Sequence, residues 1–352
     1  MPIDILMTNV VTSQSAIASY VGETVLTPTQ KEHRSSQRQI AGAIDNGILA
    51  QRYLICSQLG RGGFGMTFLA QNIYLPGQPL CVVKKFDPQF TDPTRIAIAH
   101  KQFELEALSL SRLGSHAQIP SLLDYFQVGT DLYLVEEYIP GIDLLQIVNK
   151  QGRFTESEVE IFVTQMSRLL EYLQLHHSIH RDIKPQNIIL CPTDGRFVLV
   201  DFGIVKDIDP STTSRQDLDS MAVGTPGFAP PEQLANRTVF ASDIYALGMT
   251  CIYLLTGKNP SQFPTDPYTC ELLWSDTVEI SLELSEIINK MIQLPLAERY
   301  HSATEVITAL ENRSVRAKLR TYVDRKHAIS NSHSGDRSGS YPAVVLWALG
   351  IG

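Results

Sequence analysis

The feature that most constrains this 352-residue chain is a short polar turn, His180–Asn187, with the sequence HRDIKPQN. It places an acid, a base and an amide close together, in Asp182, Lys184 and Asn187, and an apolar run follows it. The tripeptide DFG, which opens at Asp201, lies 14 residues beyond Asn187. That separation suits a hairpin, so a carboxylate and an amide oxygen can converge on one Mg²⁺, an ion that prefers hard oxygen ligands.

Composition limits the alternatives. A chain of 352 residues exceeds the roughly 250–300 at which a single core stops growing, so we expect two core regions with tails. The net charge is −8 and both signs are mixed along the chain, which gives no reason to expect a nucleic-acid partner. The five cysteines are widely spaced and form no CxxC, which predicts reduced thiols and a cytosolic compartment. No basic region followed by an apolar block marks a secretory signal.

Hydrophobic patterning predicts a strand-rich front and a helix-rich back, and therefore an α+β fold. The expected strands are residues 52–59, 80–86 and 131–139. Expected helices are residues 93–113, a long one that opens at a cap-like Thr155 with Glu158 three residues on, and shorter ones at 242–256, 282–293 and 302–311.

Glycines at Gly60, Gly62 and Gly65 lie between two strand-like runs, where they let a hairpin backbone approach phosphates. This signal alone is weak, and a plain glycine-rich hairpin explains it as well. Strand residues follow the glycines, which argues against a dinucleotide-binding unit, and no GxxxxGK[ST] motif is present. Lys84 in the next expected strand becomes informative only if a carboxylate such as Glu106 pairs with it, because a buried lysine needs a partner.

Taken in order, the glycine-rich hairpin, strand lysine, helix glutamate, HRDIKPQN, DFG and PPE resemble a protein kinase. The stretches GGFGMTFLA and GTPGFAPPEQ are similar to the bacterial serine/threonine branch of that superfamily. The resemblance spans about residues 53–312 and implies a two-lobed kinase fold, with a small β-rich N-lobe and a larger helical C-lobe. The expected divisions are a flexible N-terminal extension (1–52), the N-lobe with hinge (53–139), the C-lobe (140–312), a polar linker (313–342) and a short apolar C-terminal segment (343–352).

The resemblance also implies a role for individual residues. Asp182 accepts or orients the proton of the substrate hydroxyl, and Lys184 balances charge at the γ-phosphate. Lys84 holds the α- and β-phosphates and is locked by Glu106. The metal ligands are Asn187 and Asp201, for Mg²⁺ with Mn²⁺ as an alternative ion. The residues expected around ATP are Leu59, Gly60, Arg61, Gly62, Gly63, Phe64, Gly65, Thr67, Val82, Lys84, Glu137, Ile139, Asp143 and Ile189.

Four further positions match parts of the family pattern. Thr225 is expected to hydrogen-bond near Asp182. Glu232 is expected to pair with Arg299 and anchor the activation segment, and Asp243 to brace the backbone of the catalytic loop.

The sequence also departs from the pattern. Thr67 stands where valine is usual, and Pro230 replaces the alanine of Ala-Pro-Glu. Lys85 competes with Lys84 for the phosphate role, and we assign that role to Lys84 because the two preceding valines then fall where Ala and Ile usually stand. Glu136 guards the back of the expected adenine pocket, where a neutral residue is commoner; a buried carboxylate there must be paired or protonated.

The function predicted is a serine/threonine protein kinase that transfers the ATP γ-phosphate to Ser or Thr hydroxyls of proteins, its own activation loop included. A pseudokinase scaffold is the alternative, disfavoured because every charged and metal-binding role is filled. A small-molecule kinase is disfavoured by the activation segment at residues 201–232. No oligomeric state is predicted.

Two regions carry further hypotheses. Serines and threonines cluster within residues 211–225, and we expect phosphorylation there to activate the enzyme by pairing a phosphate with Arg181; the alternative is a solvated loop. The uncharged segment 343–352 is too short for a spanning helix, which needs about 20 apolar residues. We expect it to dock on the catalytic domain or hang loose in a cytoplasmic protein. The alternatives are contact with a membrane surface, or the start of a longer anchor.

Overall fold

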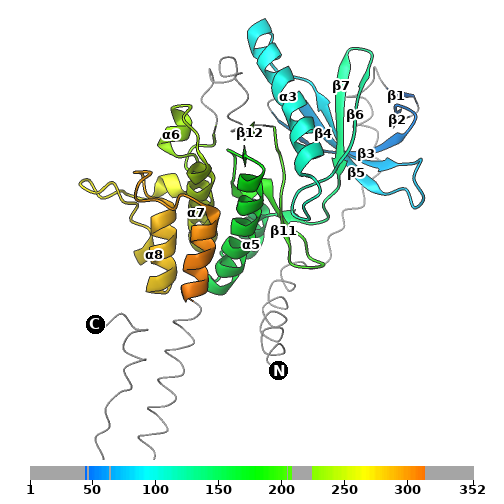
Figure 1. Cartoon of the computed structure of the whole chain (residues 1–352). Helices are drawn as coiled ribbons and strands as arrows, with labels where there is room; N and C mark the ends of the chain where they lie inside the picture. The colour runs from blue at the N-terminus through cyan, green and yellow to red at the C-terminus, as the bar shows by residue number, and fades with distance from the viewer. Residues whose placement is uncertain (1–43, 46, 63–64, 204, 208–223, 314–352) are drawn as a thin grey trace, which may run out of the picture.

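The computed structural model describes residues 44–45, 47–62, 65–203, 205–207 and 224–313. Two bodies are visible in Figure 1, a twisted sheet with one long helix and a bundle of helices beside it. This arrangement confirms the predicted two-lobed α+β fold.

The first body is a seven-stranded antiparallel sheet with the order β1-β2-β3-β4-β5-β7-β6. Its strands are β1 (Ile44–Asp45), β2 (Ile48–Leu49), β3 (Tyr53–Arg61), β4 (Gly65–Asn72), β5 (Leu80–Phe86), β6 (Leu122–Val128) and β7 (Asp131–Glu137). The sheet begins before the expected boundary at residue 52, because β2 pairs with β3 and Leu49 is fully buried.

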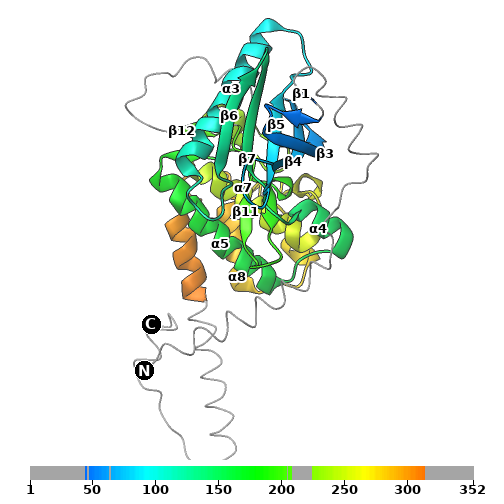
Figure 2. The ribbon, with the colours of Figure 1, turned by 90° about the vertical axis from the view of Figure 1, so that its right-hand side faces the viewer.

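Helix α3 (Pro93–Leu113) lies alongside the sheet, next to β6, as both views show (Figures 1 and 2). The helix begins where Asp92 accepts a hydrogen bond from the Arg95 amide at 2.8 Å and proline occupies the first turn, both favourable at a helix N-terminus. Phe103 on its inner face packs against Phe86, with ring centroids 5.5 Å apart. Its buried side chains join the larger hydrophobic cluster of the second body, which ties α3 to both lobes.

Helices α5 (Glu156–Leu175) and α7 (Phe240–Thr256) pack together at the centre of the second body. The predicted capping box opens α5, where the Glu158 carboxylate accepts the Thr155 amide at 2.7 Å and the Thr155 hydroxyl accepts the Glu158 amide. Almost every residue of α7 is buried, as expected for a helix that is apolar all round. The surrounding helices are α4 (Leu144–Gln151), α6 (Pro231–Leu234), α8 (Leu282–Met291) and a last helix over residues 303–313.

Among the described residues, five short strands form two small sheets apart from the large one. They are β8 (Ile142–Asp143), β9 (Ser178–Ile179), β10 (Ile188–Leu190), β11 (Phe197–Leu199) and β12 (Lys206–Asp207). Strand β10 pairs with both β8 and β11, and β9 pairs with β12. The polar turn of residues 180–187 therefore lies between β9 and β10, where both of its ends are fixed.

Candidate functional site

Asn187 and Asp201 lie at the same end of the β10–β11 hairpin. Ile188 pairs with Leu199 across the hairpin, and the Val200 amide donates to the Asn187 carbonyl at 2.9 Å. Asp201 has a φ of 68°, in the left-handed region that non-glycine residues rarely adopt. Such backbone strain typically costs about 1–3 kcal/mol and gathers at functional sites. The hairpin separation read from the sequence thus brings these two oxygen donors together.

Asp182 is the centre of a hydrogen-bonded cluster. Its carboxylate accepts from Lys184 Nζ at 2.6 Å, from Thr225 Oγ1 at 2.8 Å and from Asn187 Nδ2 at 2.9 Å. Lys184 Nζ also donates to Thr225 Oγ1 at 2.9 Å. These contacts hold the Asp182 side chain in a fixed orientation. The Asn187 amide nitrogen is committed to Asp182, which leaves its amide oxygen for another partner.

Asp243 of α7 supports the turn from behind. It accepts the backbone amides of His180 at 2.7 Å and Arg181 at 2.9 Å, and Arg181 has a φ of 69°. Burial raises the pKa of Asp243 to about 6, against the lowering effect of these two amide bonds. Burial has the opposite effect on the basic His180: it lowers the pKa of His180 to about 4, so its imidazole is neutral at pH 7. The turn therefore keeps its unusual backbone because a buried carboxylate satisfies two of its amides.

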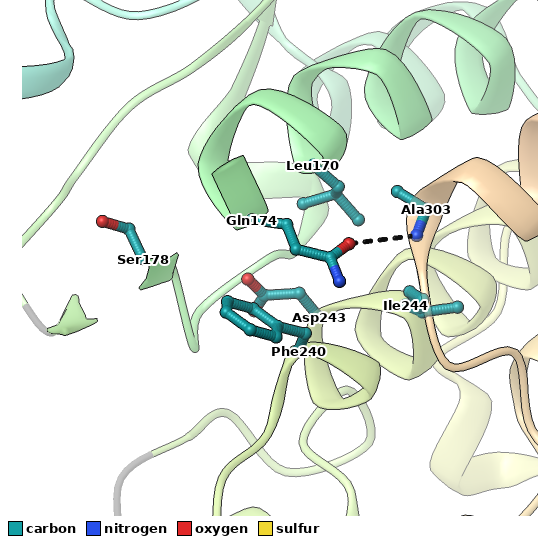
Figure 3. A pocket seen from close by; sticks show the side chains of 7 residues that line it. All are labelled: Leu170, Gln174, Ser178, Phe240, Asp243, Ile244 and Ala303. Atoms are coloured by element: carbon teal, nitrogen blue, oxygen red, sulfur yellow. Dashed lines mark hydrogen bonds between the residues drawn. The ribbon is translucent and has the colours of Figure 1, made fainter. Parts of the chain in front are cut away.

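A small pocket lies next to Asp243 (Figure 3), and no residue of the Asp182 cluster lines it. Gln174 of α5 points into it and accepts the Ala303 amide at 3.5 Å, which connects α5 to the last helix. Leu170, Phe240 and Ile244 supply apolar walls around Asp243.

Lys84 of β5 lies between two carboxylates. Its Nζ atom is 2.5 Å from Glu106 Oε1 of α3 and 3.0 Å from Glu136 Oε1 of β7. Burial acts to lower the pKa of Lys84, but the charges of Glu106, Glu136 and Asp201 outweigh it and raise that pKa. Burial raises the pKa of both glutamates, and Lys84 opposes that rise. Lys84 is therefore protonated, and it lies between acidic side chains.

The strand register separates Lys84 from its rival. Lys85 points to the other face of β5 and pairs with Asp131 at 2.7 Å. The predicted partnership of Lys84 with Glu106 is present, and Lys85 has no such contact with Glu106.

The glycine-rich hairpin closes between β3 and β4, where the Gly62 amide donates to the Gly65 carbonyl at 2.9 Å. A Cβ at Gly65 would lie 1.8 Å from the Lys85 carbonyl oxygen, so the packing of the sheet requires glycine there. A Cβ at Gly60 or Gly62 would meet nothing within 4 Å. The packing of the described residues therefore does not explain these two glycines, whereas a ligand that approaches the backbone would.

The remaining residues expected around a nucleotide come from several elements. Val82 lies two residues before Lys84 on the same face of β5, and Thr67 of β4 pairs across from Lys84. Ile139 is buried in a small apolar cluster against which Ile189 packs.

The polar residues expected around the nucleotide already have partners within the protein. The Glu137 amide donates to the Ser121 carbonyl at 2.9 Å. Asp143 caps α4 by accepting the Gln146 amide at 2.8 Å. Leu59 is half exposed, and Arg61 pairs with Asp87 at 2.6 Å. Gly63 and Phe64 lie outside the described residues.

The segment after Thr225 is anchored by a buried ion pair. Arg299 Nη1 donates to Glu232 Oε1 at 2.6 Å, and the Arg299 side chain is fully buried. Ser242 Oγ donates to the same carboxylate at 2.9 Å. The sequence predicted this pair correctly.

Most of this chain is similar to known proteins. Residues 53–309 match the protein kinase domain family. The chain belongs to the protein kinase family. Serine/threonine-protein kinase B of Synechocystis sp. is 47% identical over 279 residues, which cover 78% of this chain and 49% of that protein. Serine/threonine-protein kinase C of the same organism is 41% identical over 271 residues, which cover 75% of this chain and 50% of that protein. Serine/threonine-protein kinase PknA of Nostoc sp. is 40% identical over 268 residues, which cover 75% of this chain and 48% of that protein.

This kinase chain spans about half the length of these curated relatives. The match confirms the predicted resemblance to bacterial serine/threonine kinases. Among the described residues, no helix is both long and apolar enough to cross a membrane. The serines and threonines of residues 211–220 and the segment 343–352 lie outside the described part of this kinase.

Sequence reasoning placed Glu136 at the back of the adenine pocket but missed its pairing with Lys84. Glu136 of β7 lies directly across from Val82, and Val82 shares a face with Lys84, but no local pattern in the sequence pairs β7 with β5. Finding it required knowing that β7, and not β6, is the neighbour of β5. A second missed contact joins Gln233 Nε2 to the Arg181 carbonyl at 2.6 Å, which ties the segment after Thr225 to the catalytic turn.

Proposed function

We propose that this chain is a serine/threonine protein kinase that transfers the γ-phosphoryl group of ATP to Ser and Thr hydroxyls of proteins, including its own activation loop. The observation that carries the proposal is the cluster of Asp182, Lys184 and Thr225, in which a carboxyl group and an amino group are held side by side. The printed names of the kinase relatives, which are serine/threonine kinases, support the choice of acceptor. As in other phosphoryl transfers, positioning and charge neutralisation do most of the work.

ATP lies against the glycine-rich hairpin in this proposal. Gly60 and Gly62 leave the backbone open to the phosphates, and Lys84 binds the α- and β-phosphates. Val82 and Ile189 pack on the two faces of the adenine, and the carbonyl of Glu137 and the amide of Ile139 serve its edge. Asp143 meets the ribose while it caps α4.

Asn187 and Asp201 hold the divalent ion, which we propose to be Mg²⁺ with Mn²⁺ as a substitute. The donor set fits, since one amide oxygen and one carboxylate at the same hairpin end are the hard ligands that Mg²⁺ takes. When bound, the ion neutralises charge on the phosphates.

Each residue of the cluster then has one task. Asp182 accepts the proton of the attacking hydroxyl, and its contacts with Lys184 and Thr225 hold its side chain in place for that step. Lys184 neutralises the negative charge that develops on the transferred group. Thr225 fixes the distance between these two side chains and borders the place where the acceptor hydroxyl enters.

A transfer assay tests the proposal. The purified chain is incubated with γ-labelled ATP, Mg²⁺ and a generic basic protein, and protein-bound phosphate is analysed for phosphoserine and phosphothreonine. Label on these residues that disappears in Asp201→Asn supports the kinase. Intact ATP binding without transfer would instead indicate the pseudokinase scaffold, in which the fold only binds.

We also propose that the catalytic domain works without residues 330–352, in a cytoplasmic protein whose apolar segment 343–352 is not needed for catalysis. Deleting residues 330–352 should leave activity in buffer unchanged. Aggregation or lost activity of the shortened chain would show that the tail is part of the fold. Sedimentation of only the longer form with membranes would show that the tail is an anchor.

A further inference from the structure

Lys84 has a second acidic partner that is not part of its pairing with Glu106. Glu136 Oε1 lies 3.0 Å from Lys84 Nζ, close to the 2.5 Å of the Glu106 contact. The Glu136 and Glu106 side chains are almost equally buried, at 6% and 7% exposed. Two buried carboxylates therefore contact the same ammonium group.

The strands explain why Glu136 reaches Lys84. In the β5–β7 ladder Val82 pairs with Glu136 and Lys84 pairs with Leu134. Paired residues share a face, and so do residues two apart on a strand, so Lys84 and Glu136 are diagonal neighbours on one face of the sheet. Long side chains in diagonal positions can touch.

Glu136 is retained at a cost. Its second oxygen, Oε2, is buried and has no hydrogen-bond partner among the described residues. A buried polar atom in that state destabilises a fold, and an apolar residue in the same place would not. The favourable contact that the structure gives this carboxylate is the one to Lys84. The arrangement is explained more easily by a role that acts through Lys84 than by packing.

We propose that Glu136 is a second positioning residue for Lys84, which holds the ammonium toward the ATP phosphates from within the sheet when Glu106 is neutralised or moves away. This inference rests on the proposed kinase function. Glu106 belongs to α3, a separate element, whereas Glu136 belongs to a strand hydrogen-bonded to that of Lys84. The contact with Glu136 therefore survives a displacement of α3 that would break the contact with Glu106.

A double-mutant cycle tests the proposal. The variants are Glu106→Gln, Glu136→Gln and the two combined, and kcat and KM for ATP are measured for each. Each single variant should lose about tenfold or less in kcat/KM, because the other carboxylate remains. The combined variant should lose about tenfold more than the product of the two single losses, a coupling within the usual range for residues that share a partner.

Two results would overturn it. The losses could simply multiply, which would show that the two carboxylates act independently. Alternatively Glu106→Gln alone could be as inactive as the combined variant, which would show that Glu136 cannot hold Lys84. As a matched control, Asp131→Asn lies on the same strand β7 but pairs with Lys85 on the opposite face, at 2.7 Å. Combined with Glu106→Gln it should show no coupling.

Ligand binding separates positioning from folding. Relative to Glu136→Gln, which already lacks the carboxylate at the adenine pocket, the combined variant should bind ATP at least about tenfold more weakly while its affinity for adenosine, which has no phosphates, is unchanged. Equal loss for both ligands would indicate a structural role and overturn the inference. If Glu136→Gln does not fold, Glu136→Met takes its place, since it removes the buried carboxylate and keeps the volume. Failure of both to fold would also assign Glu136 a structural role.

The same measurements keep the two proposals apart. A wild-type chain that binds ATP but transfers no phosphate would refute the kinase function. The cycle measured in ATP affinity would then still decide whether Glu136 positions Lys84.

Discussion

Glu232→Gln should destabilise the kinase domain far more than its single lost charge suggests. Arg299 is fully buried and its guanidinium gives two donors to Glu232, at 2.6 and 3.4 Å. The neutral amide that replaces this carboxylate in the variant would leave the buried cation without an anionic partner. Its other acceptors are carbonyl oxygens, of which the closest is Gln293 O at 2.7 Å. Removing one member of a buried pair typically costs about 3–5 kcal/mol.

The carbonyl partners and the 11% exposure of Glu232 favour the lower end, about 3 kcal/mol. For a domain of about 150–250 residues, 1 kcal/mol corresponds to roughly 2–4 °C in Tm, so the midpoint should fall by about 6–12 °C. Differential scanning calorimetry of both proteins measures this difference directly.

A matched control uses an exposed ion pair of the same short length. Asp87→Asn breaks the 2.6 Å contact to Arg61, whose side chain is 44% exposed, and should shift Tm by no more than about 2–4 °C. If Glu232→Gln lowers Tm no more than this control, the buried pair does not anchor the segment and the reasoning is refuted.

Three further predictions concern other parts of the chain. Lys84→Met should reduce kcat by about 10²–10³ while Lys85→Met keeps most activity, because Lys85 faces away from Glu106; the reverse order would show the strand assignment to be wrong. Gly65→Ala should lower Tm because its Cβ overlaps a backbone carbonyl, whereas Gly62→Ala should keep Tm and weaken ATP binding; equal melting curves would contradict the packing argument. Mass spectrometry of active protein should find phosphate within residues 211–225, and a fully active enzyme with none there would refute activation by phosphorylation.

Local signals were sufficient for much of the site. The capping box at Thr155 and the hairpin that brings Asn187 to Asp201 depend on residues close in sequence, and both are present in the structure. The pairs of Lys84 with Glu106 and of Glu232 with Arg299 are long-range, and they were predictable only because a family pattern fixed them.

What the sequence could not supply was strand order. Glu136 meets Lys84 because β7 inserts between β5 and β6, an arrangement that no local pattern of alternation specifies. The start of the sheet was missed for a related reason. Strands β1 and β2 have two residues each, too few for a period-2 signal; β2 is held by pairing with β3, and β1 by pairing with β2.

The most direct measurement of the central claim is phosphate transfer by Asp182→Asn beside the wild type. Asparagine keeps the size of the side chain, and its single oxygen can still accept from Lys184 or from Thr225, which donate to different oxygens of Asp182, but it cannot accept the hydroxyl proton. With labelled ATP, Mg²⁺ and a basic protein, the wild type should label Ser and Thr, and Asp182→Asn should be slower by about 10²-fold or more at an unchanged ATP affinity. A wild type that binds ATP without labelling protein, or an Asp182→Asn variant that labels it as fast as the wild type, would contradict the account.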